Sequence, residues 1–160
     1  MASFAIDIGH GRSICIEASA KGVEINTYST LPSGQLVKVS SRSILLGLKS
    51  WKKFNDNLED IKTLFNNLTE DTPVTTDFTL HLGNLFYIRA ISAISCIHIR
   101  KYYFDEERTL KPGRPGVAFK YPEFRELLSN LPDINKVTSI ESVESCCTAD
   151  TQKDCKVCMN

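Results

Sequence analysis

The sequence predicts an α+β fold in which two tandem β-β-β-β-α repeats form a single-chain pseudo-dimer with curved antiparallel sheets. Three observations predict it. The chain matches itself at an offset of 74 residues, apolar and polar residues alternate in the first part of each copy, and apolar residues recur at three-to-four-residue steps in the second part. Alternation is typical of half-buried strands, and the longer period is typical of an amphipathic helix.

The internal repeat is the observation on which the others depend. Without a gap, the offset pairs apolar, glycine and aromatic residues of like kind: Phe4 with Phe78, Ile8 with Leu82, Gly9 with Gly83, Ile25 with Ile99, Tyr28 with Tyr102 and Leu36 with Leu110. Beyond Leu36 the register slips by one or two residues and resumes: Arg42 with Arg114, Trp51 with Phe124 and Leu58 with Leu131. A duplicated unit of this size is often unable to bury its apolar face alone.

The first copy shows the order of elements. Strands are expected at 13–17, 23–28, 35–39 and 43–48, with turns at 20–22 and 31–34, and one helix carries apolar residues from Leu48 to Phe65. In the second copy the helix is expected to stop before Pro132. The predicted division is a first repeat at 1–68, a linker at 69–77, a second repeat at 78–138 and a flexible, cysteine-containing tail at 139–160. We expect the helices around Trp51 and Phe124 to form the interface between the repeats.

Composition limits the function classes. The 160 residues carry 19 basic and 19 acidic side chains, which argues against a large electrostatic footprint on duplex DNA. Residues 77–138 hold nine basic and seven acidic side chains, so this segment is the better place for a binding face. No apolar run is long enough to span a membrane. Four of six cysteines lie in the last fifteen residues, unlike a disulfide framework, so we expect an intracellular protein, nuclear or cytoplasmic.

The second copy contains a motif with a known counterpart. Its residues 97–103 read I-H-I-R-K-Y-Y, and after an acidic turn residues 110–119 read L-K-P-G-R-P-G-V-A-F, followed by a helix with the early aromatic Phe124. This order resembles the transcriptional positive cofactor four family, which has I-D-I-R-E-Y-W, an acidic turn, M-K-P-G-R-K-G-I-S-L and a helix bearing a tryptophan. The first copy, with Ser40-Ser41-Arg42-Ser43 in place of Pro112 to Pro115, is similar to the tandem repeats of the Pur-alpha family at least as well. Both resemblances imply non-catalytic binding of single-stranded nucleic acid.

The resemblance also implies site residues. Single strands are held by basic groups along the phosphates and by aromatic side chains that stack on bases. The residues of the second copy that match family positions are Arg89, Arg100, Tyr103, Lys111 and Arg114. The candidates near the sheet of the first copy are Arg12, Lys21, Lys38 and Arg42, with Tyr28 as its aromatic.

Other interpretations stay open for these residues. The arginines could be solvated strand residues, the tyrosines could pack the sheet, and Lys-Pro-Gly-Arg-Pro-Gly could simply build a tight connection. Ile91, Ser92 and Ile94 replace the aromatic and lysines of the family's first hairpin. We therefore expect binding to be asymmetric, with most contacts from the second copy.

No catalytic, metal or cofactor site is expected. The histidines, His10, His81 and His98, stand apart from any carboxylate or cysteine motif, so we expect ordinary satisfied residues, and no phosphate loop or dinucleotide fingerprint is present. The closely spaced Cys146-Cys147 and Cys155-x-x-Cys158 are poorly arranged for zinc.

The sequence thus predicts a binding protein without enzymatic activity. Its expected partners are single-stranded DNA or RNA and proteins of transcription or replication, and whether two such chains pair further stays open. The alternative is a protein-interaction module that keeps the fold and has lost nucleic-acid binding, since the net charge is zero and the first copy is degenerate.

Overall fold

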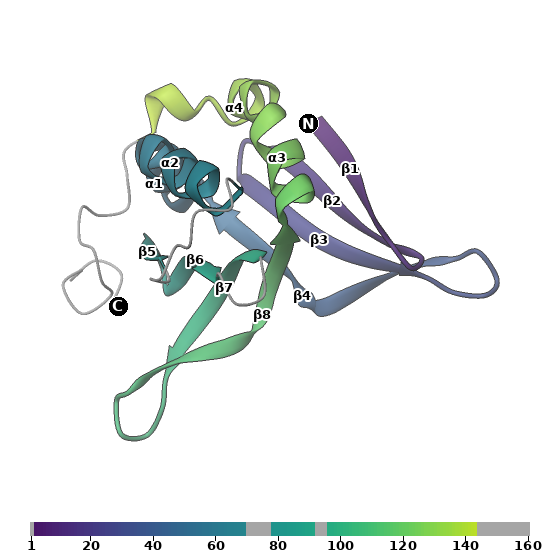
Figure 1. Cartoon of the computed structure of the whole chain (residues 1–160), viewed down its shortest axis with the longest axis horizontal. Coiled ribbons are helices and arrows are strands. Elements are labelled where there is room, and N and C mark those ends of the chain that lie inside the picture. The colour runs from purple at the N-terminus through teal and green to yellow at the C-terminus, as the bar shows by residue number, and fades with distance from the viewer. Residues whose placement is uncertain (1, 70–77, 92–95, 144–160) are drawn as a thin grey trace.

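Two four-stranded antiparallel sheets, each followed by helices, make up the computed structural model, which describes residues 2–69, 78–91 and 96–143 (Figure 1). The elements of the first half are β1 (Ala2–Gly9), β2 (Arg12–Ser19), β3 (Gly22–Thr30), β4 (Leu36–Gly47), α1 (Leu48–Asp56) and α2 (Leu58–Thr69). Those of the second half are β5 (Phe78–Gly83), β6 (Phe86–Ile91), β7 (Cys96–Phe104), β8 (Leu110–Lys120), α3 (Tyr121–Ser129), α4 (Leu131–Thr138) and the short η2 (Ile140–Ser142). The predicted tandem fold is confirmed.

The structure keeps the repeat register. β2 and β3 begin at Arg12 and Gly22, and their counterparts β6 and β7 begin 74 residues later, at Phe86 and Cys96. In both sheets the strands follow their sequence order, so each sheet is a simple meander. From the helices onward the offset is 73, within the predicted slip of one or two residues, because β8 is one residue shorter than β4.

One core joins the two halves. The buried face of the first sheet is lined by isoleucines, and that of the second by aliphatic residues at equivalent positions: Ile6, Ile14, Ile16, Ile25, Leu80, Ile88, Ile99 and Val117. The helices cover these faces across the repeat boundary, because α1 contacts β5 as well as its own β4, and α4 contacts β1 and β2. Neither half therefore buries its apolar face by itself.

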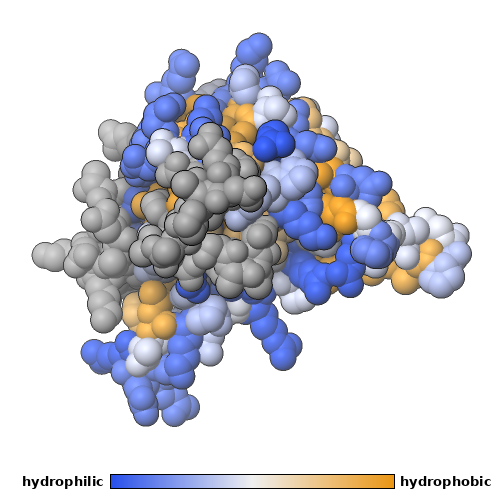
Figure 2. Space-filling model, in the orientation of Figure 1, coloured by the Kyte–Doolittle hydropathy of each residue, from blue (hydrophilic) through white to orange (hydrophobic). Residues whose placement is uncertain are grey.

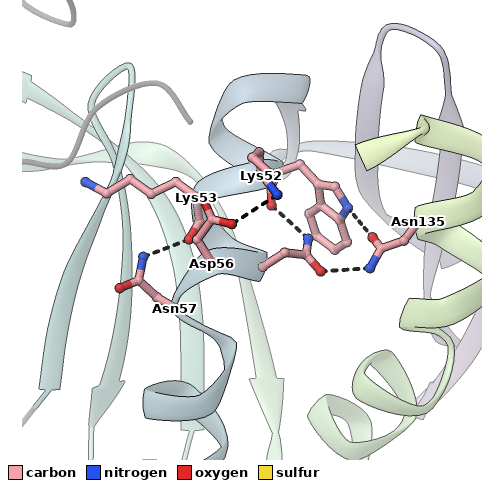
Figure 3. Close-up of polar contacts among 7 residues, drawn as sticks. Lys52, Lys53, Asp56, Asn57 and Asn135 are labelled. Atoms are coloured by element: carbon pink, nitrogen blue, oxygen red, sulfur yellow. Dashed lines mark hydrogen bonds and ion pairs between the residues drawn. The ribbon is translucent and has the colours of Figure 1, made fainter. Parts of the chain in front are cut away.

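The helices lie at the interface between the repeats, as predicted. The ring of Phe65 in α2 lies 5.5 Å from that of Phe124 in α3. The indole Nε1 of Trp51 donates to Oδ1 of Asn135 at 2.8 Å, and Nδ2 of Asn135 donates to Oδ1 of Asn55, also at 2.8 Å (Figure 3). Trp51 is fully buried, so this hydrogen bond satisfies a donor that would otherwise be costly in the core.

The prediction of one helix per repeat is wrong. Asn57 interrupts the first helix, and its side chain donates to the carbonyl of Lys53 at 2.8 Å (Figure 3). Asn130 does the same at the equivalent position of the second repeat, donating to the carbonyl of Glu126 at 2.8 Å. Asparagine competes in this way with the helical backbone, so each apolar stripe is divided between two helices. The helix of the second repeat ends at Ser129, and Pro132 lies in the first turn of α4, where its missing N–H costs nothing.

The prediction of separate strands at 35–39 and 43–48 is also wrong. Both belong to β4, which bends where residues 40–42 are bulged out of the pairing with β3. The remaining strand of the first sheet is β1, which lies outside the four predicted strand ranges. A bulge adds unpaired residues to one strand without ending that strand. In the sequence, such an interruption of the alternating pattern looks like a turn between two strands.

Some predictions fall on residues that the structure does not describe. These are the linker beyond Thr69, the four cysteines of the tail, and Ser92 and Ile94. Of the segment predicted as a flexible tail, residues 139–143 are described, and Ile140 in η2 is buried in the core. Within the described part of the chain, no helix is long and apolar enough to cross a membrane.

The interface predicts a measurable loss of stability. Replacing Asn135 by alanine removes the partner of the Trp51 indole and of the Asn55 side chain, so the free energy of unfolding should fall by about 1–3 kcal/mol. Thermal unfolding followed by circular dichroism measures this. Lys136→Ala, an exposed change on the same helix, is the control and should leave stability nearly unaltered. Two separate transitions in the wild-type chain would contradict a core shared by both repeats.

Candidate nucleic-acid interface

The two sheets differ in charge. β1 to β4 carry three basic residues, Arg12, Lys38 and Arg42, and three acidic ones, Asp7, Glu17 and Glu24. β5 to β8 carry six basic residues and no aspartate or glutamate: Arg89, Arg100, Lys101, Lys111, Arg114 and Lys120. The acidic residues of the second repeat lie in its hairpin turn and helices. The second sheet therefore offers the more favourable surface for a polyanion.

Equivalent bulges on the two edge strands position the central basic residues. In β4 the bulge comprises residues 40–42. In β8 it comprises residues 113–115, three residues that lie opposite the single residue Lys101 of β7. The bulges thus expose Arg42 and Arg114, one from each repeat. β4 and β8 contact each other although they belong to different sheets, and this contact brings the two bulges together.

A shallow cleft of about 520 Å³ lies between the bulges. Four of the predicted site residues line it together with Ser41, Pro112 and Gly113: Arg42, Arg100, Tyr103 and Arg114. Arg42 and Arg114 are exposed, and Tyr103 keeps 48% of its surface exposed, so its ring is available to a ligand. The cleft combines guanidinium groups with an aromatic face, the pairing that single strands require.

Arg100 organises the β8 side of this cleft. Its Nη1 donates to the carbonyls of Gly113 and Arg114, at 3.0 and 2.9 Å, and so satisfies backbone groups that the bulge removes from the sheet. Gly116 leaves the space for it, because a Cβ there would lie 2.8 Å from Cζ of Arg100. In the first repeat a smaller group has this task, as the Ser43 hydroxyl donates to the carbonyl of Val39 and accepts from the amide of Thr27.

Lys-Pro-Gly-Arg-Pro-Gly is thus a strand bulge, not a tight connection. It lies wholly within β8. A Cβ at Gly113 would lie only 2.7 Å from the carbonyl oxygen of Lys101, so a glycine allows the two backbones to approach closely here. Lys111, just before the bulge, forms an ion pair with Asp105 of the hairpin turn at 2.8 Å. The hydrogen bond from Lys111, followed by those from backbone amides, holds the pKa of Asp105 below its usual value. Lys111 is therefore partly neutralised before any ligand arrives.

Arg89, the remaining predicted residue of the second sheet, lies on the face away from the core, which is called its open face although His81, Tyr87, His98 and Tyr102 on it are buried. Arg89 is half-buried, and its Nη1 donates to the hydroxyl of Tyr102 at 3.4 Å. Tyr102 packs against Tyr87 at 4.7 Å between ring centroids, and Tyr87 against His81 at 5.1 Å. This aromatic row is buried, so Tyr102 packs the sheet whereas its neighbour Tyr103 faces outward.

The basic residues of the first repeat are dispersed, apart from Arg42. Arg12 pairs in register with Ser29, and Lys21 precedes Gly22 at the opposite end of β3, so the two are separated by roughly 23 Å at about 3.3 Å per strand residue. Lys38 lines a hollow that also contains Glu24. All three are exposed, but the structure does not bring them together.

The open face of the first sheet is acidic. Glu17 and Glu24 are register partners on β2 and β3, and Asp7 lies on the same face of β1. Burial, and after it the charge of Glu17, raises the pKa of the nearby Tyr28 phenol. This surface is unfavourable for phosphate. Asymmetric binding stays a prediction. Charge counted by segment does not show this contrast between the two sheets, which becomes visible only when the charged residues are assigned to strands and faces.

Comparisons with known proteins leave the family open. No protein-family model matches the chain, and no curated protein does. Among solved structures, the chain is similar to one described as crystal structures of MRP1/MRP2 from Trypanosoma brucei, with a TM-score of 0.40 and 11% identity, over 86% of this chain and 85% of that chain. At such a low score and identity, the similarity gives no information about what this chain binds.

Because Arg100 packs over Gly116, we predict that adding a single methyl group at this position destabilises the fold. Gly116→Ala places a Cβ against the guanidinium, which must then leave the Gly113 and Arg114 carbonyls, so the free energy of unfolding should fall by about 1–3 kcal/mol. Chemical denaturation measures this loss.

Gly47→Ala is the matched control, since a Cβ at Gly47 meets nothing within 4 Å. In an Arg100→Ala background the added methyl should cost much less, because the two residues are in contact and their effects are not additive. An equal loss with and without Arg100 would show that the clash lies elsewhere.

Proposed function

We propose that the chain binds single-stranded nucleic acid, DNA or RNA, through the second sheet and the cleft between β4 and β8, without catalysing a reaction. The observation that carries the proposal is the absence of acidic residues from β5 to β8, beside a cleft lined by three arginines and an exposed tyrosine. A regulatory role in transcription or replication belongs to the same proposal.

The cleft favours a single strand over a duplex. Tyr103 offers an exposed ring, and a base can stack on it only when its face is free of a neighbouring base pair. The basic surface is small, and the net charge of the chain is zero, so there is little long-range attraction for the dense phosphates of duplex DNA. Stacking must therefore supply a large part of the affinity.

The resemblance of residues 97–119 to the positive cofactor four family supports the proposal independently of the cleft. Arg100, Tyr103 and Arg114, which match family positions, all line the cleft. Arg42, from the copy that lacks most of the family signature, lines it too. We infer that the two repeats form the central part of the site jointly, while the second repeat supplies the rest.

A second function, protein interaction, has its own observation. The β3–β4 hairpin extends from the body, and its exposed apolar residues are Leu31, Leu36 and Val37 (Figures 1 and 2). The β7–β8 hairpin is hydrophilic at the equivalent place (Figure 2). The first repeat therefore has surface suited to a protein partner and an acidic open face unsuited to phosphate, so the two functions are compatible in one chain.

The proposed site predicts different outcomes for charge and stacking. With an unstructured oligonucleotide followed by fluorescence anisotropy, Arg42→Gln and Arg114→Gln should each reduce the slope of log affinity against log salt by about 0.7. Tyr103→Ala should cost roughly 1–3 kcal/mol of binding free energy and leave that slope nearly unchanged.

Lys49→Gln is the control, because it removes one exposed positive charge from α1. Its effect on the slope should be small. Absence of binding by the wild-type chain at low ionic strength would contradict the proposed function. Normal binding by a folded Tyr103→Ala variant would contradict the stacking role of this residue.

A further inference from the structure

His98 lies between two arginines on the open face of the second sheet. Arg89 is its register partner on β6, and Arg100 follows it on the same face of β7. On β8 its partner is the uncharged Ala118. The other ionisable groups on this face are the Cys96 thiol of β7 and its β8 partner Lys120. The buried phenols of Tyr87 and Tyr102 and the ring of His81 lie on it too. No carboxylate from any of the four strands reaches this cluster.

Two nitrogen atoms of this cluster are buried without a hydrogen-bond partner within the described part of the chain: Nε of Arg89 and Nδ1 of His98. His98 is only 8% exposed. The expectation that it is an ordinary satisfied histidine is therefore wrong. Nearly all buried polar groups in folded proteins have a partner, so an unpartnered pair of this kind requires an explanation. Both side chains can donate to an anion, and Arg89 and Arg100 are each partly exposed, so the cluster meets solvent at the two arginines.

We propose that Arg89, His98 and Arg100 form a site for one phosphate group of a bound strand, and that His98 takes up a proton when the site is filled. This rests on the proposed function, which it deepens by assigning a place to one phosphate and a pH dependence to binding. The phosphate oxygens would accept from Nε of Arg89, from the free part of the Arg100 guanidinium and from Nδ1 of protonated His98. His98 lies outside the residues that the sequence indicated.

The sign of the pH dependence follows from the surroundings of His98. Burial, then the charges of Arg100 and Arg89, lower its pKa to about 4, so the empty site holds a neutral ring at pH 7. A bound phosphate has the opposite charge and raises that pKa. Affinity should therefore rise as the pH falls through the pKa of the filled site, by up to about tenfold per pH unit, and level off near pH 4. Burial raises the pKa of the Cys96 thiol, which stays neutral throughout this range.

The experiment uses the full chain and two ligands. Sulfate is the simple probe, because it keeps its charge between pH 5 and 8, and the histidine ring signals are followed by NMR with and without it. The titration midpoint of His98 should move upward when sulfate is present. The second ligand is the unstructured oligonucleotide, whose affinity is measured at constant ionic strength from pH 8 to pH 5 and should increase.

Variants separate His98 from the other histidines. His98→Asn keeps an amide donor but cannot titrate, so its affinity should change much less over this pH range. Arg89→Gln should abolish the upward movement of the His98 midpoint. His10→Asn is the matched control, since asparagine tolerates the φ of 55° at this exposed position, and it should keep the wild-type pH dependence.

The two ligands also distinguish the two proposals. Movement of the His98 midpoint with sulfate, without oligonucleotide binding, would support the anion site and overturn the proposed function. Oligonucleotide binding with an unmoved His98 midpoint and a flat pH dependence would overturn the anion site and leave the function standing. If His98→Asn does not fold, the titration of wild-type His98 decides the question.

Discussion

The structure depends on one constraint: each four-stranded sheet has an apolar face that its own helices cover only in part. The halves solve this by sharing a single core, with α1 reaching β5 and α4 reaching β1 and β2. The shared core also brings the bent edge strands β4 and β8 into contact. The cleft with Arg42 and Arg114 is therefore a consequence of how the two repeats bury their apolar surface, and neither repeat could form it alone.

The open faces are free of this constraint, and they have diverged. Equivalent positions carry Glu24 in the first repeat and His98 in the second, and likewise Asn26 and Arg100. The bulges are retained in both, but the group that stabilises each differs, Ser43 in one and Arg100 in the other. The buried faces keep aliphatic residues in register. Packing thus preserves the similarity between the repeats, while charge on the open faces makes one sheet suited to a polyanion and the other unsuited.

Much of the fold could be predicted because the duplication supplies two readings of the same pattern. The strand register at an offset of 74 and the helical interface of Trp51 and Phe124 follow from apolar periodicity, and the turns follow from their glycine and proline residues. The structure confirms them. The helix breaks could not be predicted that way, because a side-chain bond from Asn57 to a carbonyl leaves the apolar period intact. The bulges and the missing hydrogen-bond partner of Nδ1 of His98 could not be predicted either, since both depend on contacts between strands. The sequence indicated four residues of the cleft, but their meeting across two repeats is tertiary information.

Mapping backbone amide changes by NMR on addition of an unstructured oligonucleotide tests most directly where the strand lies. At 17.9 kDa the chain is suited to such a measurement. We predict changes along β6, β7 and β8 and at residues 40–42 of the β4 bulge, with Glu17 and Glu24 on the open face of the first sheet unaffected. Changes confined to the open face of the first sheet, or to the helices, would contradict the assignment of the second sheet and the cleft as the binding surface.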